Sequence, residues 1–258
     1  MQIATWNVNS LKVRLPQVLQ WLASSACDVL ALQELKLDNP VNETLIEEFK
    51  ANGYHYIYNG QKTYNGVALI SKFPMTEVVY DIPNYQDAQK RIITATINGV
   101  RVICAYFVNG EALDSAKFVY KLEWLGALHD YVKNQLQLYP QLILLGDFNI
   151  APENRDTYDS ALWDGKILCS KEEREKFQQL LELGLVDSFR YFNPEDKQFT
   201  WWDYRNFAFR RKLGLRIDHI LVTDSVIKQA SQCIIDLEPR RWERPSDHTP
   251  VVLSLNLL

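Results

Sequence analysis

Cysteine is scarce in this chain, and the thiols are widely separated. The 258 residues include four cysteines and no C-x-x-C pair, at Cys27, Cys104, Cys169 and Cys233. Thiolate zinc sites need close pairs, and disulfide scaffolds are typical of much shorter secreted chains. The pattern therefore argues against both. The sequence also shows no basic-then-apolar leader before the first strand-like segment. Together with the cysteine pattern, this leads us to expect a reduced, cytoplasmic protein.

The sequence also lacks long apolar runs and an excess of positive charge. No stretch approaches the ~20 apolar residues that span a bilayer, so we expect no membrane association. The net charge of −4 gives no global attraction to nucleic acid, and a polyanion would need a local basic patch. Hydrophobic residues (47%) and charged residues (23%) are in ordinary proportion for a globular enzyme. We expect one domain over residues 1–258.

Residues 141–153, QLILLGDFNIAPE, form the most informative stretch. The apolar run 142–145 has the length and branching of a buried strand. Gly146 ends the run, and Asp147 and Asn149 follow it on either side of Phe148. Because alternate side chains of an extended backbone share a face, the carboxylate and the amide point the same way and can orient a water molecule. By itself the stretch would be read as a turn, because glycine, aspartate and asparagine are ordinary turn residues.

The remaining pattern mixes many strands with a few helices, which predicts an α/β layered fold with sheets in the centre and helices outside. Helices are expected around 15–22, from Asn42 as a cap to near Gly53, over 115–136, and from the Ser170/Glu173 capping box to Gly184. The expected strands cover residues 2–6, 28–33, 54–58, 66–71, 91–97, 100–106, 142–145, 199–202, 215–222, 233–237 and 250–255.

Polar residues end or interrupt several of these strands, and we take them as candidate site residues. They are Asn7, Glu34, Asp147, Asn149, Asp218, Asp247 and His248. Each one alone could be a solvated strand end or a structural hydrogen bond. Together they offer hard oxygen ligands without a Cys/His cluster, which favours Mg²⁺ or Mn²⁺ over zinc.

One possible pairing within this set is Asp218 with His248. Asp218 lies inside an apolar strand, and a buried aspartate can hold a histidine in one tautomer. The alternative is a purely structural Asp–His hydrogen bond. We assign His219 to side-chain packing, and His55 and His129 to structural or exposed positions.

Basic and aromatic residues alternate over 201–216, WWDYRNFAFRRKLGLR. A second mixture at 240–244 lies just before Asp247. Basic side chains bind phosphates and aromatic rings stack on bases, so we favour a nucleic-acid surface over a solvated loop. The proposed contacts are Trp201, Trp202, Tyr204, Arg205, Arg210, Arg211 and Arg216.

In this order, the motifs resemble the exonuclease III branch of the DNase I-like endonuclease/exonuclease/phosphatase superfamily. The matching segments are ATWNVNSLKVR, DVLALQELK, GQKTYNGVALIS, RIITATINGVRVICAYFVNGE, LLGDFNIAPE, GLVDSFR, FTWWDYR, LGLRIDHILV and RPSDHTPV. The resemblance implies a four-layered α/β sandwich of two mixed sheets. It also implies a monomeric, Mg²⁺-dependent nuclease acting on double-stranded DNA at 3′ ends or abasic sites.

The resemblance also assigns roles to single residues. Glu34 would be the principal metal ligand, with Asn7, Asp147, Asn149 and Asp247 as further members of the metal site. Asp147 would orient or deprotonate the attacking water, and Asn149 would position water and phosphate. His248, fixed by Asp218, would bind the phosphate oxygen, and Tyr106 would contact the phosphate or assist the leaving group. Asn109 would contact DNA. The general base, Asp147 or the Asp218–His248 pair, stays open.

The chain departs from the family pattern at three positions. Leu35 replaces a small hydroxyl residue after the metal ligand, and Val108 replaces a proline after the tyrosine. Leu168 stands where abasic endonucleases tend to carry small residues, and its bulk would block a flipped-out abasic sugar while admitting a frayed 3′ end.

Two other classes of function fit parts of the pattern: a phosphoesterase of the same superfamily acting on a small phosphate ester, and a non-catalytic nucleic-acid binder.

Overall fold

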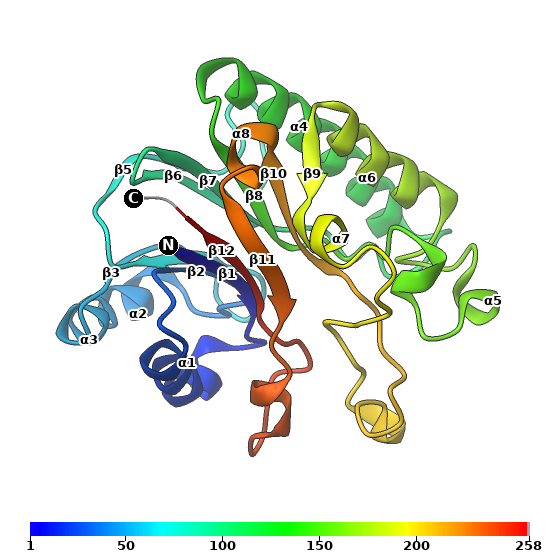
Figure 1. The fold of residues 1–258 in the computed structure, drawn as a ribbon, viewed down its shortest axis with the longest axis horizontal. Helices are drawn as coiled ribbons and strands as arrows, with labels where there is room; N and C mark the ends of the chain where they lie inside the picture. Colours follow the sequence, from blue (N-terminus) through cyan, green and yellow to red (C-terminus); the bar gives the residue numbers. More distant parts are fainter. Residues whose placement is uncertain (257–258) are drawn as a thin grey trace.

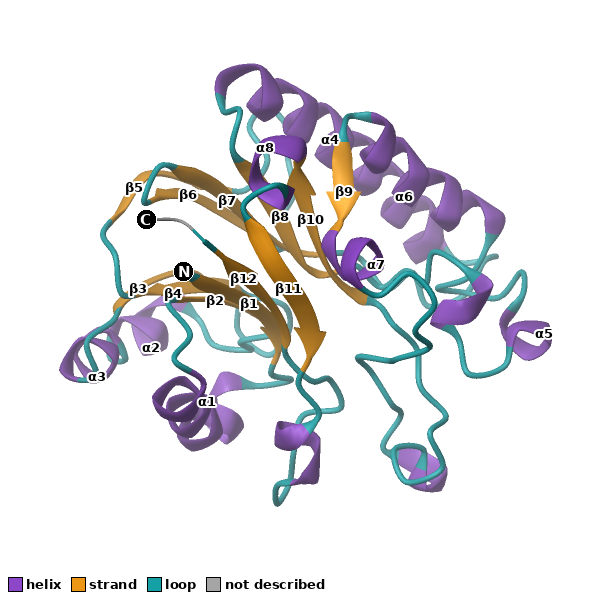
Figure 2. Cartoon of the chain, viewed as in Figure 1, coloured by secondary structure: helices purple, strands orange, loops and turns teal. Residues whose placement is uncertain are grey.

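Two six-stranded mixed sheets pack face to face in the centre of the molecule (Figures 1 and 2). A computed structural model describes residues 1–256. The first sheet has the order β11-β12-β1-β2-β4-β3 and the second β5-β6-β7-β8-β10-β9. The pairs β1–β2 and β7–β8 are parallel and the others antiparallel. The strands are β1 (Gln2–Asn7), β2 (Val29–Gln33), β3 (His55–Asn59), β4 (Val67–Ser71), β5 (Met75–Tyr80), β6 (Ile92–Ile97), β7 (Val100–Tyr106), β8 (Leu142–Asp147), β9 (Leu185–Asp187), β10 (Asp218–Thr223), β11 (Ala230–Ile235) and β12 (Val251–Leu255).

Helices cover the outer face of each sheet and complete four layers (Figure 2). The first sheet is covered by α1 (Leu11–Ser25), α2 (Asn39–Glu43) and α3 (Ile46–Ala51), and the second by α4 (Ala116–Leu138) and α6 (Lys171–Glu182). The shorter elements are α5 (Ser160–Trp163), α7 (Ser188–Phe192), α8 (Asp224–Ile227) and the 3-10 turns η1 (Asn154–Asp156), η2 (Arg205–Phe207) and η3 (Glu238–Arg241). This arrangement confirms the expected four-layered α/β sandwich. No helix of residues 1–256 has the length and apolarity to cross a membrane.

Strand β8 shows why its sequence is continuously apolar. Ile143 and Leu145 belong to the core between the sheets. Leu142 and Leu144 belong to the core that α4 and α6 cover. A strand with both faces buried needs apolar residues at every position, not at every second one. The run 142–145 is therefore buried throughout, and it carries Asp147 to the edge of the sheet.

Most of the predicted elements are present, including the Ser170/Glu173 capping box at the start of α6. The predicted cap at Asn42 is wrong. Helix α2 starts earlier, after Asp38, whose side chain accepts a hydrogen bond from the Val41 amide. Asn42 is buried and accepts a hydrogen bond from the hydroxyl of Tyr56. The apolar pattern after residue 44 belongs to the separate helix α3.

The predicted strand at 199–202 is also wrong. Trp201 forms isolated bridges to Leu215 and to His248, and no continuous ladder follows. The backbone of this segment is divided between two partners: the Trp202 amide donates to the Asp247 carbonyl, and the Thr200 amide donates to Leu215. The segment thus connects the 215 and 247 regions, both of which lead to the candidate site.

Candidate active site

Strand register brings the predicted polar residues to one edge of the sandwich. In the first sheet, Asn7 ends β1 beside Gln33 of β2, and Glu34 follows directly. In the second, Asp147 at the end of β8 pairs with Tyr106 of β7 and with Asp218 of β10. The parallel pairs place the carboxyl ends of β1, β2, β7 and β8 at the same edge. Residues distant in sequence therefore meet where the two sheets adjoin.

Asn7 links the two sheets at this edge. Its side-chain amide donates to Glu34 Oε1 and to Asp147 Oδ2, both at 2.9 Å. Tyr106 donates its hydroxyl to Glu34 Oε1 at 3.0 Å, and Lys36 Nζ lies 3.0 Å from Glu34 Oε2. Glu34 has a φ of +54°, a left-handed conformation that is unfavourable for a glutamate. Non-glycine residues in this conformation cluster at functional sites, where surrounding contacts offset the strain.

His248 lies between two carboxylates. Its Nδ1 is 2.9 Å from Asp218 Oδ2, and its Nε2 is 3.7 Å from Asp147 Oδ2. Burial disfavours the imidazolium, but Asp218 and Asp147 outweigh burial and raise the pKa of His248 to about 10. The ring is therefore a cation at neutral pH, in a position to stabilise negative charge on a bound oxygen.

Asp147 and Asn149 lie side by side, but the reason is a tight turn and not the predicted extended backbone, because β8 ends at Asp147 and Asn149 has a φ of +50°. The Asn149 amide donates to Asp147 Oδ1 at 2.9 Å, and its side chain donates to the Phe107 carbonyl at 3.1 Å. Phe148 turns away and stacks on Phe107, with ring centroids 4.1 Å apart. Burial raises the pKa of Asp147 to about 7, with Asp218 adding to the shift and His248 opposing it. Such a carboxyl group can exchange a proton near neutral pH.

Three of these residues bring possible metal ligands together, and while His248 is an imidazolium the ligands would be the two carboxylates. One ligand atom from each of Glu34, Asp147 and His248 lies within 4.8 Å of the other two. Asp247 is outside this group: its carboxylate accepts hydrogen bonds from Asn9 Nδ2 and Trp201 Nε1, both at 3.0 Å. The predicted role of Asp247 in the metal site has no direct support from these contacts.

The two basic and aromatic segments meet beside the site. The loops that carry η2 and η3 project from the same side of the molecule (Figure 1). The Tyr204 hydroxyl donates to the Pro245 carbonyl, and the Arg240 guanidinium lies over the rings of Trp202 and Phe209. Between the loops is a hollow of about 450 Å³. Tyr204, Arg205, Arg210 and Arg211 are exposed, as a DNA contact surface requires.

Two of the predicted DNA contacts are corrected by burial. Arg216 is 1% exposed, and its guanidinium is ion-paired with Asp156 at 2.7 Å and Asp187 at 2.8 Å. Trp202 is 4% exposed and packs edge-on against Phe209. Neither side chain is free to reach a nucleic acid. Both stabilise the segments that carry the exposed residues.

The three histidines that were not assigned to the site lie outside it. His219 is buried, and its Nε2 is 2.9 Å from the Ile150 carbonyl. Burial and the Arg216 charge lower the pKa of His219 to about 4, so it stays neutral. His55 is exposed and His129 half-buried, and both are outside the cluster around His248.

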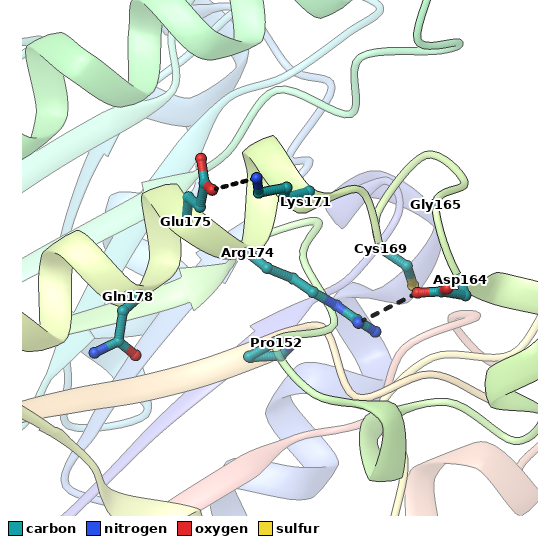
Figure 3. Close-up of a pocket in the computed structure, with 8 residues that line it drawn as sticks. All are labelled: Pro152, Asp164, Gly165, Cys169, Lys171, Arg174, Glu175 and Gln178. Carbon is teal, nitrogen blue, oxygen red and sulfur yellow. Dashed lines mark ion pairs between the residues drawn. The ribbon is translucent and has the colours of Figure 1, made fainter.

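Leu168 lies on a loop beside the site. It is 6% exposed, has a φ of +71°, and packs in a cluster with Ala151, Leu215 and Ile217, to which Trp201 adds. Asn109 reaches the same neighbourhood, where its side-chain amide donates to Asn149 Oδ1 at 3.1 Å. A separate cavity of about 570 Å³ lies on the outer side of this loop (Figure 3).

Sequence reasoning missed two residues next to the site, Lys121 and Glu173. Both are fully buried and ion-paired with each other. Glu173 was predicted only as half of a capping box. Lys121 lies on the apolar face of α4, three residues after Phe118 and four before Leu125. The signal in the sequence was a lysine on the apolar face of a predicted helix. A buried ammonium group requires several acceptors, so such a lysine indicates polar partners close to it.

Comparisons with known proteins agree with this geometry. Residues 4–248 match the Endonuclease/Exonuclease/phosphatase family. The chain is 35% identical to exodeoxyribonuclease III of Haemophilus influenzae, over 97% of this chain and 98% of that protein. It is 31% identical to an exodeoxyribonuclease of Bacillus subtilis over the full length of both. Solved structures that match over the full length of both chains include a 3′ phosphatase, NExo, from Neisseria bound to a product DNA hairpin (50% identity, TM-score 0.97), and an AP endonuclease from Archaeoglobus fulgidus (35%, 0.95).

Proposed function

The chain belongs to the endonuclease/exonuclease/phosphatase family and is a DNA-repair nuclease of the exodeoxyribonuclease III type, and we propose that it trims 3′ ends of double-stranded DNA as a single-domain, Mg²⁺-dependent monomer. The observation that carries the proposal is the convergence of Glu34, Asp147 and His248 at one edge of the sandwich. The exposed basic and aromatic loops beside that edge supply the surface for the duplex.

The donor set fits a hard divalent cation. Glu34 and Asp147 offer carboxylate oxygens, and the adjacent Asn7 has an amide oxygen that can take part after rotation. We assign Glu34 as the principal ligand, with Asn7 beside it, and Mg²⁺ as the ion. When bound, the cation would neutralise charge on the phosphate and polarise its oxygens.

The side chains around the ion have separate tasks. Asp147 accepts a proton from the attacking water, which Asn149 orients from the neighbouring position. His248 donates to the phosphate oxygen where negative charge grows, and Asp218 fixes its ring. Because the pKa of His248 is raised to about 10, this ring keeps its proton at neutral pH and is a poor general base. We therefore favour Asp147 as the base. Tyr106 contacts the phosphate or assists the leaving group.

Leu168 supports 3′-end processing over incision at internal abasic sites. Its side chain fills the space beside Trp201 and Ile217, next to the strand end that carries Asp218. A flipped-out sugar would compete with this leucine for space, whereas a frayed 3′ end can approach along the open edge. The 50% identical Neisseria structures are described as a 3′ phosphatase and a 3′-5′ exonuclease, in line with this preference.

Two alternatives use parts of the same site. A phosphoesterase for small esters would need Glu34 and His248 but not the exposed Arg205, Arg210 and Arg211. A non-catalytic binder would need the arginines but not the buried Asp218–His248 pair. The structure has both features side by side, which favours a nuclease.

A gel assay with three labelled duplexes tests the proposal: a recessed 3′ end, a 3′-phosphate end and an internal tetrahydrofuran abasic analogue. Each is incubated with Mg²⁺, with Mn²⁺ and with a chelator, and soluble inositol phosphates are assayed in parallel. We expect Mg²⁺-dependent processing of both 3′ ends and weak internal incision. The variant Glu34→Gln serves as the matched inactive control. Cleavage that survives the chelator, or release of phosphate from inositol phosphates alone, would contradict the proposal.

A further inference from the structure

The ammonium group of Lys121 is enclosed beside the active site and has no exposed surface. It extends from α4 and donates to the Asn149 carbonyl at 2.8 Å, the Asn109 carbonyl at 3.2 Å and the Glu173 carboxylate. A lysine has three N–H donors, so each one has an acceptor. Two of these acceptors are the backbone carbonyls of Asn149 and Asn109, both of which line the candidate site.

Glu173, the ionic partner of Lys121, is equally enclosed and organises the loop that carries Leu168. Its Oε1 accepts from the Leu168 amide at 3.0 Å as well as from Lys121. Its Oε2 accepts from the amide and the hydroxyl of Ser170, at 3.0 and 2.7 Å. The carboxylate therefore does more than cap α6. It connects the Leu168 loop to the same lysine that holds Asn149.

The two loops joined by this ion pair are both conformationally strained. Asn149 has a φ of +50° and Leu168 a φ of +71°, and neither is a glycine. The Ala151 amide donates to the Leu168 carbonyl at 2.8 Å, so the loops also contact each other directly. Such conformations persist only when surrounding contacts fix them. The Lys121–Glu173 pair supplies contacts to both strained segments at once.

The outer side of the Leu168 loop is held by the next residue of α6. Figure 3 shows Arg174 extending from α6 toward Asp164, with a nitrogen–oxygen distance of 3.8 Å. Arg174 Nε also donates to the Ala151 carbonyl at 3.2 Å. Glu173 therefore holds the loop from the buried side, and Arg174 from the side of the cavity. Only Glu173 is connected through Lys121 to Asn149.

We propose that the buried Lys121–Glu173 ion pair is a positioning element that sets Asn149 and Leu168 relative to each other. Through Asn149 it controls the turnover of the reaction, and through Leu168 it controls which 3′-end or abasic substrate is accepted. The inference rests on the proposed function. A buried ion pair with a purely structural role can usually be replaced by apolar groups without loss. Here Lys121 also donates to the backbone carbonyls of Asn149 and Asn109, which line the site. Replacing the ion pair with two apolar side chains would leave these carbonyls without their donor.

The test compares Lys121→Met, Glu173→Gln and Lys121→Arg with a matched control, Arg101→Met. Arg101 is also a buried cation, but it lies at the opposite end of β7 from Tyr106 and donates to Gln135 and the Glu77 carbonyl. Each variant is checked by circular dichroism and thermal unfolding. The activities measured are removal of a 3′ nucleotide and incision at an internal tetrahydrofuran site.

We expect Lys121→Met to lower kcat for 3′-end removal on the order of 10- to 100-fold, with KM within about threefold, because small displacements of a positioning group have effects of this size. The ratio of internal incision to 3′-end removal should rise in Lys121→Met and in Glu173→Gln. Lys121→Arg should recover part of kcat, and Arg101→Met should keep both kcat and the ratio. An unchanged kcat in Lys121→Met, or an equal loss in Arg101→Met, would overturn the inference.

A readout independent of activity separates this inference from the proposed function. Backbone amide chemical shifts of Asn109, Asn149 and Leu168 are compared in the wild type, Glu173→Gln and Arg101→Met. We expect displaced signals for these residues in Glu173→Gln only, a substitution that keeps the size of the side chain. Unmoved signals overturn the positioning role. A wild type that cleaves none of the DNA substrates overturns the proposed function instead.

Discussion

Asp218 lies directly opposite Asp147 in the antiparallel pair of β10 and β8, and His248 lies against both carboxylates. Two buried acids on adjacent strands would repel each other if both were ionised alone. The imidazolium offsets this repulsion, which is why its pKa is raised. This cross-strand register therefore creates the pair of carboxylates that contacts His248 and keeps it charged.

Replacing His248 removes the cation from this arrangement. His248→Ala should lower kcat by about 10²–10³-fold, the usual cost of losing one donor to a developing oxyanion. The exposed His55→Ala is the matched control and should keep full activity. Initial rates on a recessed 3′ end provide the measurement, with circular dichroism to confirm the fold. Near-normal turnover of His248→Ala would show that this assignment is wrong.

Asp218 should set the alkaline limit of activity. In the wild type His248 must stay protonated, so turnover should fall only as the pH approaches its pKa of about 10. Asp218→Asn removes one of the two carboxylates that raise this pKa. The alkaline limb of the pH–kcat profile should therefore move to lower pH. Profiles of kcat from pH 6 to 10 on the same substrate test this. If the alkaline limb of Asp218→Asn lies at the same pH as that of the wild type, the protonated form of His248 is not the form required for activity.

Leu168→Gly should increase incision at internal abasic sites. The native φ of +71° suits glycine, so the backbone loses strain while the side chain that packs beside the site disappears. Leu168→Met keeps the bulk and should behave like the wild type. The readout is cleavage of a duplex with a central tetrahydrofuran residue. If glycine brings no gain there, Leu168 is not the residue that excludes the sugar.

The exposed arginines of the η2 loop should contribute to DNA affinity through phosphate contacts. Arg210→Ala with Arg211→Ala should weaken binding similarly for all sequences and reduce the slope of log K against log salt by about two, or about one per contact. Lys133→Ala, on the exposed face of α4, should leave that slope unchanged. Titration of a labelled duplex at several salt concentrations measures it. An unchanged slope in the double variant would place the duplex elsewhere.

Asp156 should make the free energy of unfolding depend on pH in the acid range. Burial alone would raise its pKa, but Arg216 and Arg190 outweigh burial and lower it from 3.8 to about 2. The stabilising effect is nearly complete above pH 4, is lost as the pH falls through the folded pKa of about 2, and is gone only below both pKa values, where the carboxyl is protonated in both states. Its size is about 2 kcal/mol at neutral pH.

The test is urea unfolding of the wild type and Asp156→Asn at pH 7, 5, 4 and 3. The difference in free energy of unfolding should be constant down to about pH 4 and then narrow. Surface pairs such as Lys50–Glu47 contribute little by comparison. A difference that stays constant to pH 3 would mean that Asp156 is not ionised through this pair.

The site residues at strand ends could be predicted because their placement depends on local geometry. A buried strand that stops at a polar residue carries that residue to a sheet edge, and parallel neighbours share the edge. Asn7, Glu34 and Asp147 met this condition. The fold could be anticipated for the same reason, since apolar runs of strand length alternate with a few amphipathic helices.

The errors came from partners distant in sequence. Arg216 looked like a DNA contact because basic and aromatic residues surround it, but Asp156, 60 residues earlier, neutralises it in the interior. Strand β5 was missed because it lies at the edge of its sheet, is largely exposed, and has an irregular register between Thr76 and Val79. An ion pair between residues 60 positions apart cannot be recognised in a single sequence. An edge strand whose apolar and polar residues do not alternate regularly cannot be recognised either.

The first sheet is assembled from residues 2–71 and 230–255, while the second comes from the continuous stretch 75–223. Closing the β1–β12 pair joins segments about 250 residues apart, so this pairing carries a large entropy cost of chain closure. His248 lies just before β12, and it contacts Asp147 and Asp218 only when that strand is in place. The two ends of the chain must therefore meet before the site acquires its cation.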